Sequence, residues 1–269
     1  MKRAIYLTIL GVIEIVCIIV GIAINVGGIG SFFNIKTSYI SKSEEISVND
    51  TIDAFEALEV DLSAAELIVQ TGDGYGIHYE GSDVLKPTCS VKGGTLKVES
   101  PSVKRSWRNH VKCSLTITVP EHTKLTGAVF DIDAGNVECT GISAENLSID
   151  VNAGNVEVYN AVYGAADVDV DAGNVTFADC TISSVAADSN MGNVEFGNCT
   201  FDRMDATTDM GNVTVQSSRD LSDYSIDMSA DLGNISINGQ DMTGRYKVDG
   251  DEGHFVNIDV SMGNAELFY

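Results

Sequence analysis

The residues best placed to do chemistry are aspartates and asparagines that recur every 19 residues ahead of a repeated glycine. Eight of them stand four or two positions before that glycine: Asp131, Asp133, Asp150, Asn152, Asp169, Asp171, Asp188 and Asn190. If the repeats stack in register, carboxylates of neighbouring repeats lie about 5 Å apart and repel one another. Hard oxygen ligands of this kind suit Ca²⁺. These positions are therefore candidates for a weak calcium site, and the alternative is a solvated acidic face.

Known calcium motifs and enzyme motifs do not fit the sequence. In Asp169-x-Asp171-x-Gly173 a glycine stands where an EF-hand loop has its third ligand. The chain has no H-E-x-x-H, no P-loop and no G-x-S-x-G motif. Parallel β-helices can host acid-catalysed polysaccharide cleavage, but here the acids form regular columns and no single convergent pair. We therefore expect a non-catalytic protein with no cofactor other than weakly bound Ca²⁺.

One segment is both basic and aromatic. It contains the only tryptophan of the chain and several of its 16 basic residues. Its members are Lys104, Arg105, Trp107, Arg108 and Lys112. These residues are candidates for contact with anionic lipid headgroups, wall polymers or a protein partner. The alternative is an exposed loop between two strands.

The six cysteines do not form a recognisable disulfide framework. Cys17 lies in an apolar run near the N-terminus, which leaves an odd number elsewhere. Cys180 and Cys199 are 19 residues apart and could be bridged if the repeats stack, and Cys89 and Cys113 are a second pair. Buried free thiols are the favoured interpretation.

The element that must position these residues is a repeat marked by the dipeptide Gly-Asn. Its asparagines are Asn136, Asn155, Asn174, Asn193, Asn212, Asn234 and Asn264. The first four intervals are all 19 residues, and a valine follows each of the first five glycines by two positions. Apolar and polar residues alternate around it, which is typical of strands with one buried face. An invariant interval favours stacked parallel coils over antiparallel hairpins, and residues 51–269 would give about eleven coils.

Two further expectations follow from this stack. The repeated asparagines should form a hydrogen-bonded ladder with a structural role, as amides do along parallel sheets. Residues 58–69 match the repeat with Ala65 in the place of the glycine, and residues 77–80, 95–98 and 114–120 are further alternating strands. The N-terminal half therefore belongs to the same body and is expected to cap it.

Charge and hydropathy indicate the location of the chain. The net charge is -23, which argues against a nucleic-acid partner because phosphate binding needs a basic surface. Residues 5–27 are almost wholly apolar and long enough to span a bilayer core of roughly 30 Å. We interpret them as an uncleaved signal anchor, with a cleaved signal peptide as the alternative. Lys2 and Arg3 favour an inside N-terminus, and Glu14 within the run could pair with another membrane helix.

The order of these features resembles a known family. An apolar anchor, "LEVDLSAAELIV", "GGTLKVES", "LTITVPE" and repeated "D-x-D-A-G-N-V-E-V" resemble the bacterial adhesin-like β-strand-repeat family of unknown function, over residues 52–269. The resemblance implies a cell-envelope protein with a β-helix-like outer domain. It transfers no catalytic residue.

These observations predict an all-β parallel β-solenoid with coils of about 19 residues, preceded by one transmembrane helix. The expected parts are a cytoplasmic stub (1–4), the anchor (5–27), a linker (28–50), capping strands (51–120) and the Gly-Asn repeat solenoid (121–269). The expected function is an extracellular binding, adhesion-like or scaffold module with an envelope protein or surface glycan as partner. A sensor or regulatory accessory acting through its transmembrane helix is the alternative, and a polysaccharide-active enzyme is the least favoured.

Overall fold

The computed structural model describes residues 44–101 and 113–269. The predicted anchor at residues 5–27 and the basic segment from Lys104 to Lys112 lie outside these ranges. Within them, no helix is long and apolar enough to cross a membrane. The first strand begins at Glu45, inside the segment predicted as a linker.

The described part of the chain is all-β, with one short 3-10 turn, η2 (Asp83–Leu85). The strands in chain order are β1 (Glu45–Thr51), β2 (Ala57–Leu62), β3 (Glu66–Gly72), β4 (Gly76–Ser82), β5 (Thr88–Lys92), β6 (Thr95–Glu99), β7 (Ser114–Pro120), β8 (Lys124–Ile132), β9 (Val137–Thr140), β10 (Ser143–Ala153), β11 (Val156–Tyr159), β12 (Val162–Ala172), β13 (Val175–Ala178), β14 (Thr181–Met191), β15 (Val194–Met210), β16 (Val213–Ser217), β17 (Tyr224–Leu232), β18 (Ile235–Ile237), β19 (Gln240–Met242), β20 (Arg245–Val248), β21 (Asp251–Met262) and β22 (Ala265–Phe268).

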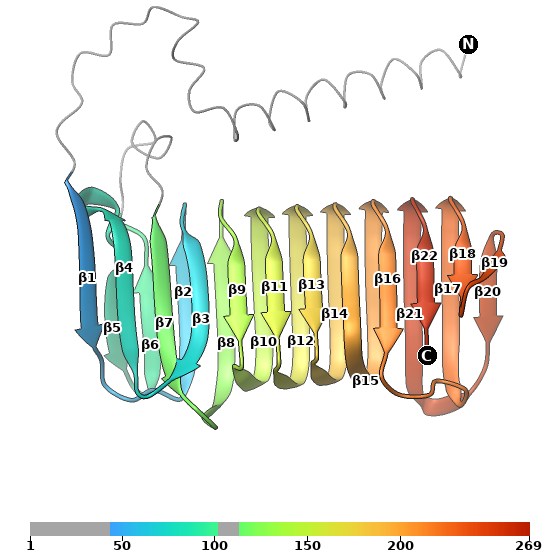
Figure 1. The fold of residues 1–269 in the computed structure, drawn as a ribbon, viewed down its shortest axis with the longest axis horizontal. Coiled ribbons are helices and arrows are strands. Elements are labelled where there is room, and N and C mark those ends of the chain that lie inside the picture. Colours follow the sequence, from blue (N-terminus) through green and yellow to red (C-terminus); the bar gives the residue numbers. More distant parts are fainter. Residues whose placement is uncertain (1–43, 102–112) are drawn as a thin grey trace, which may run out of the picture. The chain divides into compact units, whose positions relative to one another are not determined.

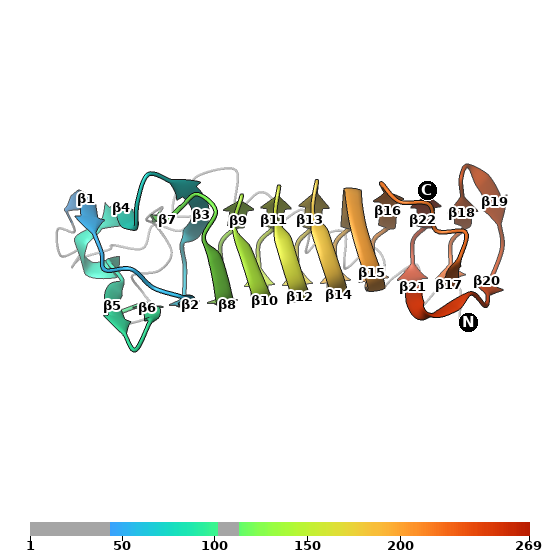
Figure 2. The ribbon, with the colours of Figure 1, turned by 90° about the horizontal axis from the view of Figure 1, so that it is seen from below.

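The strands form two facing sheets whose coils stack in parallel, as the repeat predicts (Figures 1 and 2). Each coil contributes one strand to sheet B and the next strand to sheet A. In sheet A, Val156 pairs with Val137 on one side and with Val175 on the other. In sheet B, Val151 pairs with Val170 in the same way. Residues 19 apart are therefore direct neighbours throughout this region.

The interior is built from columns of identical or similar side chains. Val137, Val156, Val175, Val194 and Val213 are each fully buried. Phe177 and Phe196 stack with ring centroids 5.1 Å apart and nearly parallel planes. Because a single coil cannot bury its apolar face alone, each layer depends on the coils on either side of it.

From Gly135 onward, the first corner of each coil requires glycine because backbones approach closely there. A Cβ on Gly154 would lie 1.8 Å from the carbonyl oxygen of Gly135, and φ at Gly154 is +156°. The next residue forms the predicted asparagine ladder: the backbone N–H of Asn155 donates to Asn136 Oδ1 at 3.0 Å. The same bond joins each later coil to its neighbour. Ala65 takes the glycine position, as expected, and lies against Gly135.

A second corner has a left-handed backbone that was not predicted from the sequence. Gly141, Asn160, Asp179 and Asn198 follow one another at 19-residue intervals with φ between 53° and 74°. Glycine, asparagine and aspartate are the residues that tolerate this conformation most readily. Their regular spacing is a signal in the sequence that could have located this corner.

The order of coils along the stack departs from the order in the chain at both ends. From one end to the other the coils are β6–β7, β2–β3, β8–β9, β10–β11, β12–β13, β14–β15, β15–β16, β21–β22 and β17–β18. Strand β15 serves two coils because it runs through both sheets. The described residues thus form nine coils, fewer than the eleven expected.

The exchanges explain the irregular spacing after Gly211. Gly263 lies against Gly211, and Gly233 lies against Gly263, so the last repeat is inserted between its two predecessors. The expectation that consecutive repeats stack directly on one another is therefore wrong at the ends. In chain order, the outermost coil β17–β18 comes first, and the antiparallel edge strands β19 and β20 follow it. The last coil, β21–β22, then lies between β17–β18 and the coil β15–β16.

Candidate functional site

One outer column of sheet B carries like charges in successive coils. Asp61, Asp131, Asp150, Asp169 and Asp188 are direct neighbours in that order. Partial desolvation of the exposed carboxyl group, together with the charges of Asp188 and Asp150, raises the pKa of Asp169 above its ordinary value. The predicted acidic column therefore exists in register, and at Thr207 it is interrupted.

In the second predicted column, amide side chains stand between the carboxylates and donate hydrogen bonds to them. Asn152 Nδ2 donates to Asp133 Oδ1 at 3.2 Å, and Asn190 Nδ2 donates to Asp171 Oδ1 at 2.7 Å. Alternation of aspartate and asparagine thus separates the carboxylates of this column. Among the residues described, no group of three or more His, Cys, Asp or Glu side chains is arranged to hold a metal ion. Calcium binding stays a prediction for the eight candidate positions.

The buried cysteines serve the packing of the coils. Cys139, Cys180 and Cys199 are buried free thiols. Cys180 and Cys199 each donate to main-chain carbonyls, at 3.3 Å to Ala178 and at 3.4 Å to Gly197. Burial raises the pKa of the Cys139 thiol strongly, so this thiol stays protonated.

An apolar strip follows one corner of the C-terminal half. Met191, Met210, Met262 and Leu232 are neighbours in successive coils, in the column where earlier coils have alanine. Met191 is 46% exposed and Leu232 is 61% exposed. No prediction from the sequence included these residues, although each directly precedes a Gly-Asn pair.

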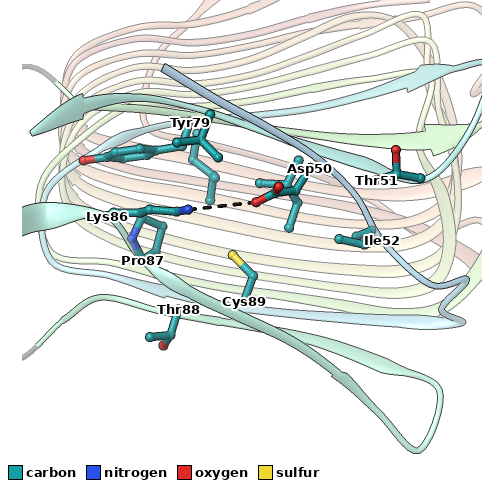
Figure 3. A pocket seen from close by; sticks show the side chains of 11 residues that line it. Asp50, Thr51, Ile52, Tyr79, Lys86, Pro87, Thr88 and Cys89 are labelled. Carbon is teal, nitrogen blue, oxygen red and sulfur yellow. Dashed lines mark ion pairs between the residues drawn. The ribbon is translucent and has the colours of Figure 1, made fainter. Parts of the chain in front are cut away.

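A pocket of about 480 Å³ opens at the N-terminal end of the solenoid (Figure 3). It exists because the two sheets continue unequally beyond the coil β6–β7. Sheet A adds two strands there, β4 and β1, whereas sheet B adds only β5. The inner face of β1 and β4 consequently lacks part of the opposite wall that covers it elsewhere in the stack.

The floor of the pocket is the apolar core itself. Val48, Tyr79 and Leu115 are cross-strand neighbours on β1, β4 and β7. Leu115 and Tyr79 are almost completely buried, and the Tyr79 hydroxyl donates to the carbonyl of Ser82 at 2.7 Å, which fixes its ring. Ile52 and Ile77 extend the same surface.

The rim carries two opposite charges and a thiol. Asp50 pairs with Ile77 and therefore occupies an inward position, where the equivalent residues of the sheet are apolar. Its Oδ2 lies 3.9 Å from Lys86 Nζ. Cys89 also lines the pocket, and partial burial raises the pKa of its thiol. Figure 3 shows Lys86 and Asp50 directed toward each other with the Cys89 sulfur beneath them.

None of the site residues predicted from sequence lines this pocket. The acidic columns lie on the outer face, and the basic segment is outside the described ranges. Sequence reasoning missed the pocket because it depends on how many strands each sheet adds at its end. An aspartate at an inward position of the first strand was the available signal, but that position is known only once the register of β1 and β4 is known.

Comparisons with known proteins place this fold in a family. The sequence model of the Toastrack DUF4097 family matches residues 55–267, and the chain belongs to that family. A search of curated proteins found no match. A candidate adhesin from Bacteroides fragilis NCTC 9343 is similar in structure, with a TM-score of 0.56 and 18% identity over 84% of this chain and 98% of that one. At that identity the likeness shows the fold alone.

Two further solved structures are matched more loosely. A candidate cell adhesion protein from Clostridium sporogenes ATCC 15579 has a TM-score of 0.38 and 14% identity, over 84% of this chain and 99% of that one. A candidate lipid-binding protein from Parabacteroides distasonis ATCC 8503 has a TM-score of 0.35 and 12% identity, over 83% and 94%. These two superpositions are too loose to support an argument about function.

Proposed function

We propose that this chain is a non-catalytic binding module of a bacterial cell envelope, anchored in the membrane by residues 5–27, with its solenoid outside the cell. The pocket at the N-terminal end is the ligand site. It is the observation that carries the proposal, because concave apolar sites of 300–1,000 Å³ with a few polar groups are typical of small-molecule binding.

The distribution of acids supports binding over catalysis. General acid-base cleavage needs carboxyl groups that converge on one bond. Among the described residues, Asp50 is the one acid that lines the pocket, and the acidic columns lie on the outer face of the coils. Rigid coils that fix the pocket walls suit a module whose role is to hold a ligand or present a surface.

The binding role is tested with an apolar fluorescent probe, 1-anilinonaphthalene-8-sulfonate. Val48→Trp places a large ring in the pocket, whereas Val129→Trp, at a position 47% exposed on β8, is the matched control. We expect probe fluorescence to rise with the unmodified chain and with the control, and to be lost with Val48→Trp. Equal fluorescence from both variants would show that the probe binds elsewhere and would refute the pocket as the ligand site.

The envelope location is tested separately by cell fractionation. The full chain should sediment with membranes and be cleaved by protease added outside intact cells. A chain of residues 28–269 should lose the membrane association. Recovery of the full chain in the soluble cytoplasmic fraction would contradict the proposed location.

A sensor or accessory role is the second candidate, favoured by one sequence observation. Glu14 lies within the apolar run, and intramembrane acids commonly face a partner helix. Affinity capture with the full chain and with Glu14→Leu distinguishes the two roles. A sensor partner should be lost with this substitution, whereas ligand binding in the pocket should persist.

A further inference from the structure

The rim of the pocket has the chemistry to receive a zwitterion. Lys86 Nζ and Asp50 Oδ2 are 3.9 Å apart, and their side chains remain 40% and 61% exposed. An exposed pair at this separation contributes little to stability. The ammonium has three donors and the carboxylate about four acceptor positions, so each retains capacity for a ligand. Either charge alone on a ligand would be attracted by one group and repelled by the other.

The interior of the pocket has the chemistry to receive a hydrocarbon chain. Below the rim, Val48 and Ile52 are the partly exposed apolar walls, and Ile77, Tyr79 and Leu115 also line the pocket but are buried. The volume of about 480 Å³ lies in the lower part of the range of about 300–1,000 Å³ that is typical of small-molecule sites. We therefore expect a ligand with one chain. The pocket is too small for a lipid with two long chains.

We propose that the pocket binds a single-chain amphiphile with a zwitterionic head, its ammonium on Asp50, its anionic group on Lys86, and its alkyl chain against Val48 and Ile52. This inference rests on the proposed function, because it names the ligand class of the same site. The shared recognition chemistry also exists in free apolar amino acids, which carry both charges on a short side chain.

Binding by the full chain is measured with four probes below their aggregation concentrations: dodecylphosphoethanolamine, dodecyl phosphate, dodecylamine and leucine. The zwitterionic amphiphile should bind at least fivefold more tightly than either singly charged one. Leucine should bind far more weakly, because it leaves most of the apolar wall uncovered. Tight binding of leucine without binding of dodecylphosphoethanolamine would overturn the proposal in favour of an amino-acid site.

Charge variants test the assignment of the two rim groups. Lys86→Met should shift the preference toward dodecylamine, and Asp50→Asn should shift it toward dodecyl phosphate, each by about fivefold or more. Lys92→Met is the matched control, because Lys92 is a nearby cation, at the end of β5, that does not line the pocket. An unchanged order of affinities in both rim variants would overturn the proposal.

Cys89 supplies a readout confined to the pocket. Maleimide modification of this thiol, followed by peptide mass mapping, should slow at least fivefold in the presence of dodecylphosphoethanolamine. Saturable binding without protection of Cys89 would place the amphiphile elsewhere and overturn the proposal. Protection by the anilinonaphthalene probe but by none of the charged amphiphiles would leave the binding module standing and refute only the zwitterion.

Discussion

At the scale of single residues, the fold depends on glycines, which have no side chain, as much as on the asparagines that follow them. The glycine column lets neighbouring coils approach until no Cβ fits, and the asparagine column supplies the hydrogen bonds that the sharp corner would otherwise lack. These requirements explain why Gly-Asn recurs at the same corner of the coils. Because both residues stand at the same corner, the dipeptide recurs once per coil, and in the central coils that interval is 19 residues.

The glycine column predicts a large loss of stability from one added methyl group. In Gly173→Ala the new Cβ would lie 1.7 Å from the carbonyl oxygen of Gly154, so the coils must separate. We expect a loss of about 3 kcal/mol or more in the free energy of unfolding. Gly74→Ala is the control, because a Cβ added to Gly74 would have nothing within 4 Å of it. Denaturant unfolding of both variants checks this, and equal midpoints would contradict it.

The acidic column predicts a gain of stability when one carboxylate is removed. The pKa of Asp169 is raised in the folded chain, so folding favours the protonated form, and ionisation above that pKa costs stability. Asp169→Asn should therefore raise the free energy of unfolding near pH 7, and with it the melting temperature. The gain should be only a few tenths of a kcal/mol, because the group is exposed and screened. The difference should disappear as the pH falls below the ordinary carboxyl pKa of 3.8.

The neighbouring column supplies the control for this charge effect. Asp171 accepts a hydrogen bond from Asn190, so Asp171→Asn removes a bonded acceptor and should not stabilise the chain. High salt should also reduce the gain from Asp169→Asn, since screening weakens the repulsion that the substitution relieves. A gain that is independent of both pH and salt would contradict the electrostatic explanation.

Calcium binding is a separate prediction for the same column. If Ca²⁺ bridges carboxylates of neighbouring coils, millimolar CaCl₂ should raise the melting temperature by a few degrees more than NaCl of matched ionic strength. Asp150→Asn should reduce that increment. Identical melting temperatures in the two salts would remove the calcium hypothesis and leave a solvated acidic face.

At the scale of elements, the strands at the two ends of the stack differ from the coils between them because they form the open edges of the sheets. An open sheet edge invites pairing with another chain, and edge cations discourage it. Arg245 and Lys247 lie on the edge strand β20, and both contact Asp227 on β17, with Lys247 Nζ 3.2 Å from Asp227 Oδ2. These contacts, led by the hydrogen bonds from Arg245, lower the pKa of Asp227.

The edge strand β20 leads to the prediction that its two cations limit self-association of the chain. Replacing both cations, in Arg245→Thr with Lys247→Thr, should leave a polar, β-prone edge without repelling charges. We expect concentration-dependent oligomers by sedimentation velocity, with the unmodified chain monomeric at the same concentration. Lys124→Thr on the internal strand β8 is the control and should stay monomeric. A monomeric double variant would show that edge charge does not limit association.

The same contrast between coils and ends explains what could be predicted from the sequence. Valine columns, the asparagine ladder and Ala65 at a glycine position all follow from a period that each side chain repeats. The pocket does not, because it arises from the unequal number of antiparallel strands added to the two sheets. No periodic pattern specifies that β1 and β4 extend one sheet while β5 alone extends the other.

At the scale of the whole described molecule, both ends interleave coils that are distant in sequence. The coil β2–β3 is held between β6–β7 and β8–β9, and β21–β22 is held between the coils of β16 and β17. Sequence pattern could not reveal this exchange, because the repeats at Gly233 and Gly263 present similar apolar columns to either neighbour. Figure 1 shows the result, with β21 and β22 next to β16 and the earlier β17 and β18 beyond them.

This exchange predicts an unusual response to truncation. Removing residues 251–269 takes a coil from within the stack, so β17 and β18 lose the partners on which they rest. Amides of β17 and β18 should lose their protection from hydrogen exchange, while those of β10 to β13 keep it. Retained protection in β17 would mean that it can move inward onto β15, and would contradict a fixed coil order.

The exchange also has a consequence for how the protein is made. A ribosome produces residues 224–237 before residues 251–268, although the later segment must lie beneath the earlier one. The apolar edge of β15 and β16 therefore lacks its native partners, β21 and β22, until these two strands have been synthesised. During that interval the nascent chain is most exposed to wrong partners, and a chaperone or a slow translocation step would have its greatest effect there.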